Sequence, residues 1–167
     1  ELLRVGEYDI GDNDIAMFVF GFIDVNHHLH KYFATQGLAA LHSLVDNYFE
    51  TIRGVMRQLP PSVGVWVHGI VPPANLPDPQ QVHMQETTPT NSAEELRMKV
   101  LFSIAVNSRM RRLCDEDGEY SDFHYVDMFD EYADAEGFLK QEHTFMYSHV
   151  FNYTDATKAQ VAKAVLQ

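Results

Sequence analysis

Hydrophobic residues in this chain gather in short stretches separated by longer stretches with a helical period. These stretches cover Ile15 to Phe20, which Gly21 ends, Val63 to Val71, which Pro72 ends, and Phe123 to Met128. Short apolar runs with such boundaries are typical of strands buried on both faces of a sheet. The pattern therefore predicts three buried strands.

Helical periodicity fills the stretches between these runs. Residues 37–58 repeat apolar side chains about every 3.6 positions, and Pro60-Pro61 ends the pattern. The apolar positions of this helix are Leu41, Leu44, Val45, Tyr48, Ile52, Val55 and Met56. A second helix is predicted from Ser92, with Glu95 completing a capping box, to about Cys114. Shorter helical segments are expected at residues 129–133 and after Thr154.

The predicted elements alternate as β-α-β-α-β-α. Strands separated by helices form a parallel sheet with right-handed crossovers, so the sequence predicts an α/β protein. A chain of 167 residues suits one domain, and we expect residues 1–167 to form it.

Composition excludes several classes of protein. The net charge is −12, from 12 basic and 24 acidic residues, which argues against binding to a nucleic-acid backbone. No apolar run approaches the roughly 20 residues that span a bilayer, so we expect a soluble protein. The single cysteine, Cys114, rules out an intramolecular disulfide and is compatible with a reducing compartment, but it does not determine the localisation. No phosphate-binding glycine loop is present, and we expect no cofactor.

Two groups of polar residues follow the predicted strands or precede the last helix. The first group is Gly21, Asp24, Asn26, His27, His28 and His30, and the second is His143, Ser148 and His149. Sites of open α/β sheets form at the carboxyl ends of the strands, so the two groups are expected to face each other. Three interpretations stay open: histidines exposed in a polar loop, a catalytic or substrate site, and a metal site. The spacing of the first three histidines fits no common zinc motif.

Several of these pieces occur in the order seen in the SGNH (GDSL-like) hydrolases. Gly21-Phe22-Ile23-Asp24 resembles the Gly-Glu-Ile-Asp third block of one branch. Val71-Pro72-Pro73, then Asn107 ahead of Leu113-Cys114, then Tyr125 to Met128, and finally Ser148-His149 follow in the family's order. The resemblance spans Ile15 to Leu166. It implies a three-layer α/β/α, flavodoxin-like parallel sheet.

The resemblance also implies a site for ester hydrolysis. Such enzymes use a Ser nucleophile and a His base, with backbone N–H groups stabilising the oxyanion. His149 resembles the base, Gly21 and Asp24 match the third block, and Gly21 would contribute to the oxyanion hole. Asn26 and His28 are candidate substrate contacts. The implied substrate is an acyl ester, with no metal and no cofactor.

The chain departs from the family pattern at four places. No Gly-Asp-Ser occurs, Phe22 stands at the Glu position, Asn26 at the Arg position, and Met146 three residues before His149 where an Asp is usual. Loss of the nucleophile removes most of the contribution of a catalytic triad. Either the Ser lies on an N-terminal strand outside these 167 residues, or the chain is a degenerate member. Phe22 and Met146 favour degeneracy, because truncation cannot explain them.

The first strand of the family would be central in the sheet. Without it the sheet keeps an open edge that a missing segment or a protein partner must complete. The sequence therefore predicts a non-catalytic structural or interaction subunit built on an SGNH-like fold. The alternative is an SGNH-type esterase whose Ser nucleophile lies in a further N-terminal segment.

Overall fold

Three parallel strands form the sheet of this protein. The computed structural model describes residues 10–75, 93–115, 118 and 120–143. Strands β1 (Ile15–Val19), β2 (Gly64–His68) and β3 (Phe123–Val126) lie in the order β1-β2-β3. Met17 pairs with Trp66, and Trp66 pairs with His124 on the other side. The predicted parallel sheet is thereby confirmed, with strands somewhat shorter than the apolar runs.

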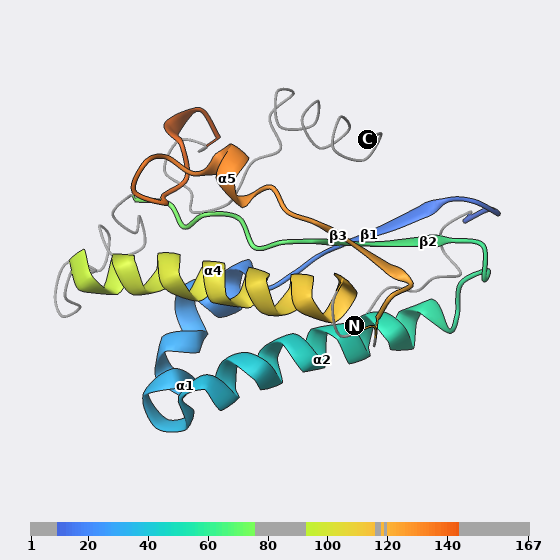
Figure 1. The fold of residues 1–167 in the computed structure, drawn as a ribbon, viewed down its shortest axis with the longest axis horizontal. Coiled ribbons are helices and arrows are strands. Elements are labelled where there is room, and N and C mark those ends of the chain that lie inside the picture. The colour runs from blue at the N-terminus through green and yellow to red at the C-terminus, as the bar shows by residue number, and fades with distance from the viewer. Residues whose placement is uncertain (1–9, 76–92, 116–117, 119, 144–167) are drawn as a thin grey trace, which may run out of the picture.

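The long helices cover one face of this sheet. Helices α1 (Leu29–Gln36) and α2 (Leu38–Met56) connect β1 to β2, and α4 (Ala93–Asp115) connects β2 to β3. Figure 1 shows α2 and α4 on the same side of the strands, with the short α5 (Phe129–Tyr132) on the other side. Two right-handed crossovers that step in the same direction across a sheet place their helices on the same face. The described residues thus form an α/β fold, and the helix predicted after Thr154 lies outside them.

The main core lies between the sheet and the helices α2 and α4. From α2, the buried side chains recur at helical spacing and include Leu41, Val45, Ile52 and Val55, as the sequence predicted. Phe49 is fully buried as well, although it was not among the predicted positions. These side chains meet Val65 and Val67 of β2 and the buried face of α4. Burial of these apolar side chains supplies roughly 25 cal/mol for each Å² removed from water, which makes this layer the main source of stability.

A second apolar cluster covers the opposite face of the sheet. It consists of Val71, Val126, Met128, Tyr132 and Leu139, with Phe22 and Trp66 packed against it. Side chains alternate between the two faces of a strand, so Trp66 reaches this cluster while its neighbours Val65 and Val67 reach the main core.

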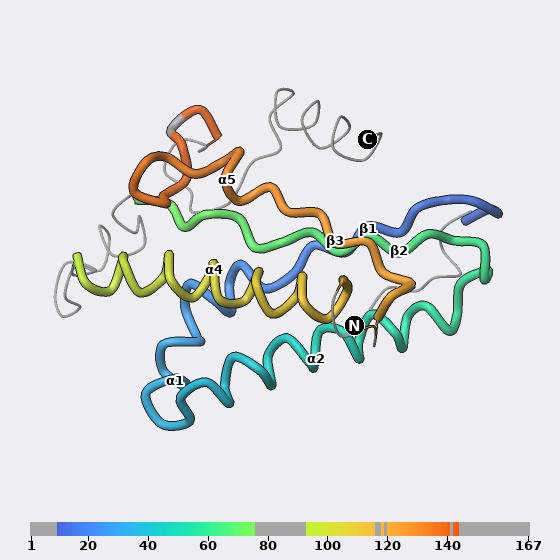
Figure 2. Tube along the Cα trace, in the orientation of Figure 1, coloured from blue at the N-terminus to red at the C-terminus, as the bar shows by residue number. Residues whose placement is uncertain are grey.

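The segment after β1 differs from one sequence-based interpretation. Histidines 27, 28 and 30 would lie in an exposed loop, but the structure has the π-helix η2 (Asp24–His28) running directly into α1. Figure 2 shows the chain leaving β1 and turning at once into these helices. Val25 and Leu29, four residues apart, are almost fully buried. Burial of these two side chains on one side of the segment stabilises it as a helix. The four-residue spacing between them was hard to recognise in the sequence because three histidines surround it.

No helix in the described ranges has the length and apolar content needed to cross a membrane.

Candidate functional site

The chain turns sharply at Gly21, directly after β1. Gly21 has a φ of 86°, in the left-handed region where glycine is favoured. A Cβ at this position would lie 2.7 Å from Cδ1 of Ile70 and 2.8 Å from Cε2 of Tyr48. Only glycine therefore allows the turn after β1 to pack against the loop after β2, at the carboxyl edge of the sheet.

Asp24 lies one turn further on and is held by α2. The phenol of Tyr48 donates a hydrogen bond of 2.7 Å to Oδ2 of Asp24. Burial raises the pKa of Tyr48, and the hydrogen bond to Asp24 raises it further, so the phenol remains a donor. One carboxylate oxygen of Asp24 is thus engaged in a contact between two helices.

Asn26 and Phe22 are turned toward the interior. Asn26 is 5% exposed, and its Nδ2 donates a hydrogen bond of 2.8 Å to the carbonyl oxygen of Phe22. The ring of Phe22 packs against the second apolar cluster. Both side chains therefore stabilise the turn after β1.

Asp24 and His28 line the same open hollow. It has a volume of about 240 Å³ and lies between η2, α1 and α2. Its other polar walls are Tyr32, Gln36, Ser43 and Asn47, and its apolar walls are Leu29, Ala40 and Leu44. A carboxylate, an imidazole and a hydroxyl here share one small space. No hydrogen bond joins Ser43 to His28, so these residues do not form an assembled nucleophile and base.

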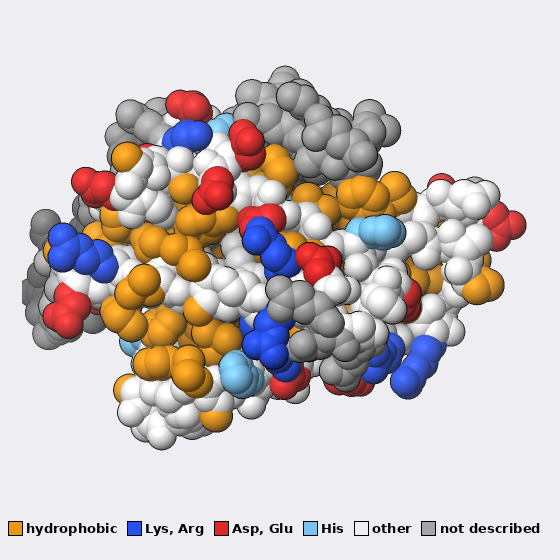
Figure 3. All heavy atoms as spheres, in the orientation of Figure 1, with side chains coloured by type: hydrophobic (Ala, Val, Ile, Leu, Met, Phe, Trp, Pro, Cys, Tyr) orange, Lys and Arg blue, Asp and Glu red, His pale blue; other side chains and the backbone are white. Residues whose placement is uncertain are grey.

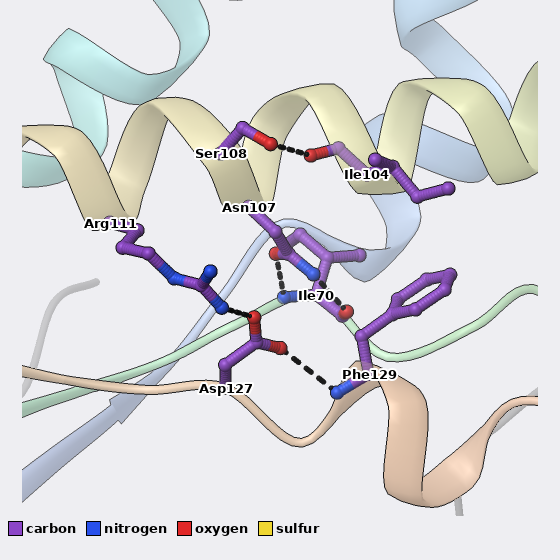
Figure 4. Close-up of polar contacts among 7 residues, drawn as sticks. All are labelled: Ile70, Ile104, Asn107, Ser108, Arg111, Asp127 and Phe129. Atoms are coloured by element: carbon purple, nitrogen blue, oxygen red, sulfur yellow. Dashed lines mark hydrogen bonds and ion pairs between the residues drawn. The ribbon is translucent and has the colours of Figure 1, made fainter.

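A buried amide fixes the loop after β2. Oδ1 of Asn107, on α4, accepts a hydrogen bond of 2.6 Å from the N–H of Ile70, and Nδ2 donates one of 2.9 Å to the carbonyl oxygen of the same residue (Figure 4). Beside it, Arg111 pairs with Asp127, which also accepts a hydrogen bond of 3.0 Å from the N–H of Phe129. Helix α4 thereby holds the loops after β2 and β3 in place.

His68, at the end of β2, is a polar residue that the sequence interpretation missed. Only 1% of it is exposed, and Nδ1 lies 2.6 Å from the carbonyl oxygen of Gly69, so this nitrogen carries the proton. Its Nε2 is buried without a hydrogen-bond partner. Burial lowers the pKa of His68 and keeps the ring neutral. Its place inside the predicted buried strand from Val63 to Val71 was the available signal.

The second predicted polar group lies only partly within the described residues. His143 is 3% exposed, and its ring lies with its edge against Tyr132, with centroids 5.0 Å apart. The candidate base His149, together with Ser148 and Met146, lies outside the described residues. The expectation that the two polar groups face each other thus stays a prediction.

Where the structure describes the chain, no three His, Cys, Asp or Glu residues gather closely enough to hold a metal ion.

Comparison with known proteins shows similarity at the level of the fold. No protein-family model matches the chain, and no curated protein sequence matches it. A solved structure described as "a putative platelet activating factor from Streptococcus pneumonia" superposes with a TM-score of 0.55 at 18% sequence identity. The match covers 92% of this chain and 58% of the other, so this chain spans little more than half the length of that protein. At this identity the likeness shows a shared α/β fold.

Proposed function

We propose that this chain is a non-catalytic structural or interaction subunit built on an SGNH-hydrolase-like fold. The observation that carries the proposal is the internal use of the third-block side chains. The family resemblance implies that side chains at these positions are directed at substrate. In this chain the side chains at these positions pack in the interior or make contacts between helices.

Three positions support this interpretation. Phe22 replaces the usual Glu and packs into an apolar cluster, so no carboxylate is available there. Asn26 replaces the usual Arg and binds the backbone of its own turn. Asp24 shares a hydrogen bond with Tyr48, which ties η2 to α2. A site built for catalysis presents such groups to the reacting atoms in a fixed geometry.

A second candidate function, ester hydrolysis, is favoured by a different observation. Asp24 and His28 line a hollow large enough for a small ligand, next to the carboxyl edge of the sheet. The fold is also shared with a structure whose description names a platelet activating factor. In this alternative His149 is the base, Gly21 contributes to the oxyanion hole, and the Ser comes from a segment beyond these residues.

Hydrolysis of p-nitrophenyl acetate by the full natural chain separates the two functions. The proposed function predicts that turnover is the same for the unaltered protein, for His149→Ala and for His42→Ala. His42 is exposed on α2 and serves as the matched control. Turnover that His149→Ala abolishes and His42→Ala leaves intact would overturn the proposal and support the esterase.

Completion of the sheet is part of the same proposal. Among the described strands, β1 pairs with β2 alone, and Ile15 and Val19 are each 49% exposed. A further segment or a partner strand that pairs along β1 remains our expectation.

A further inference from the structure

The outer side of α4 carries a stripe of exposed residues with regular spacing. Its members are separated alternately by three and four positions: Glu94, Arg97, Leu101, Ile104, Ser108 and Arg111. All six are exposed, while the opposite side of α4 is buried against the sheet. Alternation of three and four residues is the spacing of a seam between two paired helices.

The centre of this stripe is apolar. Leu101 is 56% exposed and Ile104 is 44% exposed, which is high for two large aliphatic side chains one turn apart. Beside them a hollow of about 310 Å³ between α1 and α4 is lined in part by Phe33, Met98 and Phe102. Figure 3 shows hydrophobic side chains gathered on this face over α4 and α1. Contiguous exposed apolar surface of this kind marks sites of protein association.

The ends of the stripe carry opposite charges. Glu94 lies in the first turn of α4, and Arg111 lies near its last turn. The two residues are equally far from the midpoint between Leu101 and Ile104, and so are Arg97 and Ser108. Two copies of α4 packed in parallel would set Glu94 against Glu94 and Arg111 against Arg111, which is unfavourable. Packed antiparallel, they would set each Glu94 against an Arg111.

We propose that a second copy of this chain docks on this stripe, with the two α4 helices antiparallel about a twofold axis. Leu101 of each copy packs against Ile104 of the other at the centre. Glu94 of each copy pairs with Arg111 of the other at the rim, and Arg97 faces Ser108. Arg111 retains its pair with Asp127, because its side chain is 53% exposed and has further N–H donors to offer. Such an interface is self-complementary, as a twofold dimer requires.

Sedimentation velocity of the chain over a range of micromolar concentrations tests the proposal. We expect a reversible dimer, and we expect Leu101→Glu to weaken it by at least about tenfold in Kd. Ile23→Glu is the matched control, since Ile23 is 63% exposed outside the stripe, and should leave Kd unchanged. A monomer at every concentration, or a dimer indifferent to Leu101→Glu, would overturn the proposal.

A charge exchange tests the antiparallel orientation. Glu94→Arg alone and Arg111→Glu alone should each weaken the dimer, because each sets like charges opposite one another. An equimolar mixture of the two variants should recover the affinity, since every position 94 then faces an opposite charge at position 111. Circular dichroism confirms that each variant is folded. Failure of the folded variants to recover affinity on mixing would contradict the proposed pairing. The readout is mass, so it is independent of any hydrolytic activity.

Discussion

Individual polar side chains in this protein act mainly on the backbone. Asn107 is the clearest case, because one buried amide satisfies both the N–H and the carbonyl of Ile70. A buried backbone group left without a partner costs about 1–3 kcal/mol. The loop after β2 therefore depends on a residue from α4 that lies 37 positions further along the chain.

Replacement of Asn107 should measure this dependence. Asn107→Ala removes both hydrogen bonds, and we expect the free energy of unfolding to fall by about 2–4 kcal/mol in a urea titration. Ser108→Ala is the control, because the hydroxyl of Ser108 is exposed and bonds only to the carbonyl of Ile104 within its own helix. It should change the free energy of unfolding by about 0.5 kcal/mol or less. Equal effects of the two substitutions would show that the amide does not hold the loop.

His68 should make the stability of the protein depend on pH. Burial lowers its pKa in the folded state below the ordinary value of 6.5. Below that pH the unfolded chain binds a proton that the folded chain does not, so the free energy of unfolding falls as the pH falls. The contribution of a single group is at most about 1.4 kcal/mol per pH unit.

The variant His68→Gln isolates this contribution from that of the other histidines. Between pH 7 and pH 5 we expect the unfolding free energy of the unaltered protein to fall more steeply than that of His68→Gln. Chemical denaturation at four or five pH values within this range gives the two slopes. Parallel slopes would mean that the folded protein accepts the proton at His68 as readily as the unfolded chain does.

At the scale of elements, the junction between β1 and η2 depends on one glycine. Gly21 combines a left-handed φ with a contact surface already occupied by Ile70 and Tyr48. The space beside Gly54, within α2, is open, because a Cβ there would meet nothing within 4 Å. The two glycines therefore allow the same substitution to be compared in two surroundings.

Alanine at the two positions should change stability in opposite directions. Gly21→Ala should lower the free energy of unfolding by about 1–3 kcal/mol, through strain and overpacking. Gly54→Ala should raise it by about 0.5–1 kcal/mol, because alanine loses less conformational entropy in a helix. Thermal unfolding followed by circular dichroism gives both changes. Destabilisation by Gly54→Ala, or no effect of Gly21→Ala, would contradict this account of the elements.

Sequence patterns predicted the long elements well and the segment after β1 poorly. The helix α2 was predictable because its apolar positions repeat over nineteen residues against polar neighbours. In η2 and α1 the only buried apolar residues are Val25 and Leu29, and a π-helix does not keep the 3.6-residue period. A short helix with so few buried positions leaves too little pattern to distinguish it from a loop.

At the scale of the whole molecule, the order of the strands follows from the order of the elements. Each helical connection moves one strand along the sheet in the same direction, which gives β1-β2-β3. Crossovers of the usual right hand then place their helices on one face, where α2 and α4 lie together. This arrangement buries one side of α4 and leaves its other side as the proposed dimer face. The carboxyl edge of the sheet, with Asp24 and Gly21, belongs to a different part of the surface.

The candidate site could be predicted only in part. Gly21, Asp24, Asn26 and His28 were recognised as a polar group that follows a buried strand, because strand ends in parallel sheets carry such groups. What each side chain does there depends on distant partners. The bond from Tyr48 to Asp24 joins residues 24 positions apart, and no local pattern reports it.

The sequence by itself determined the α/β class, the three strands, the long helices and the set of polar candidates, because these depend on local periodicity and on general rules of chain connection. The tertiary structure decided which of the candidate polar side chains make internal contacts and which side of α4 stays exposed. It also decided that His68 and Asn107 are buried where they affect the stability of the fold. Those properties arise from contacts between residues far apart in the chain. Such contacts exist only once the sheet and its helices have packed together.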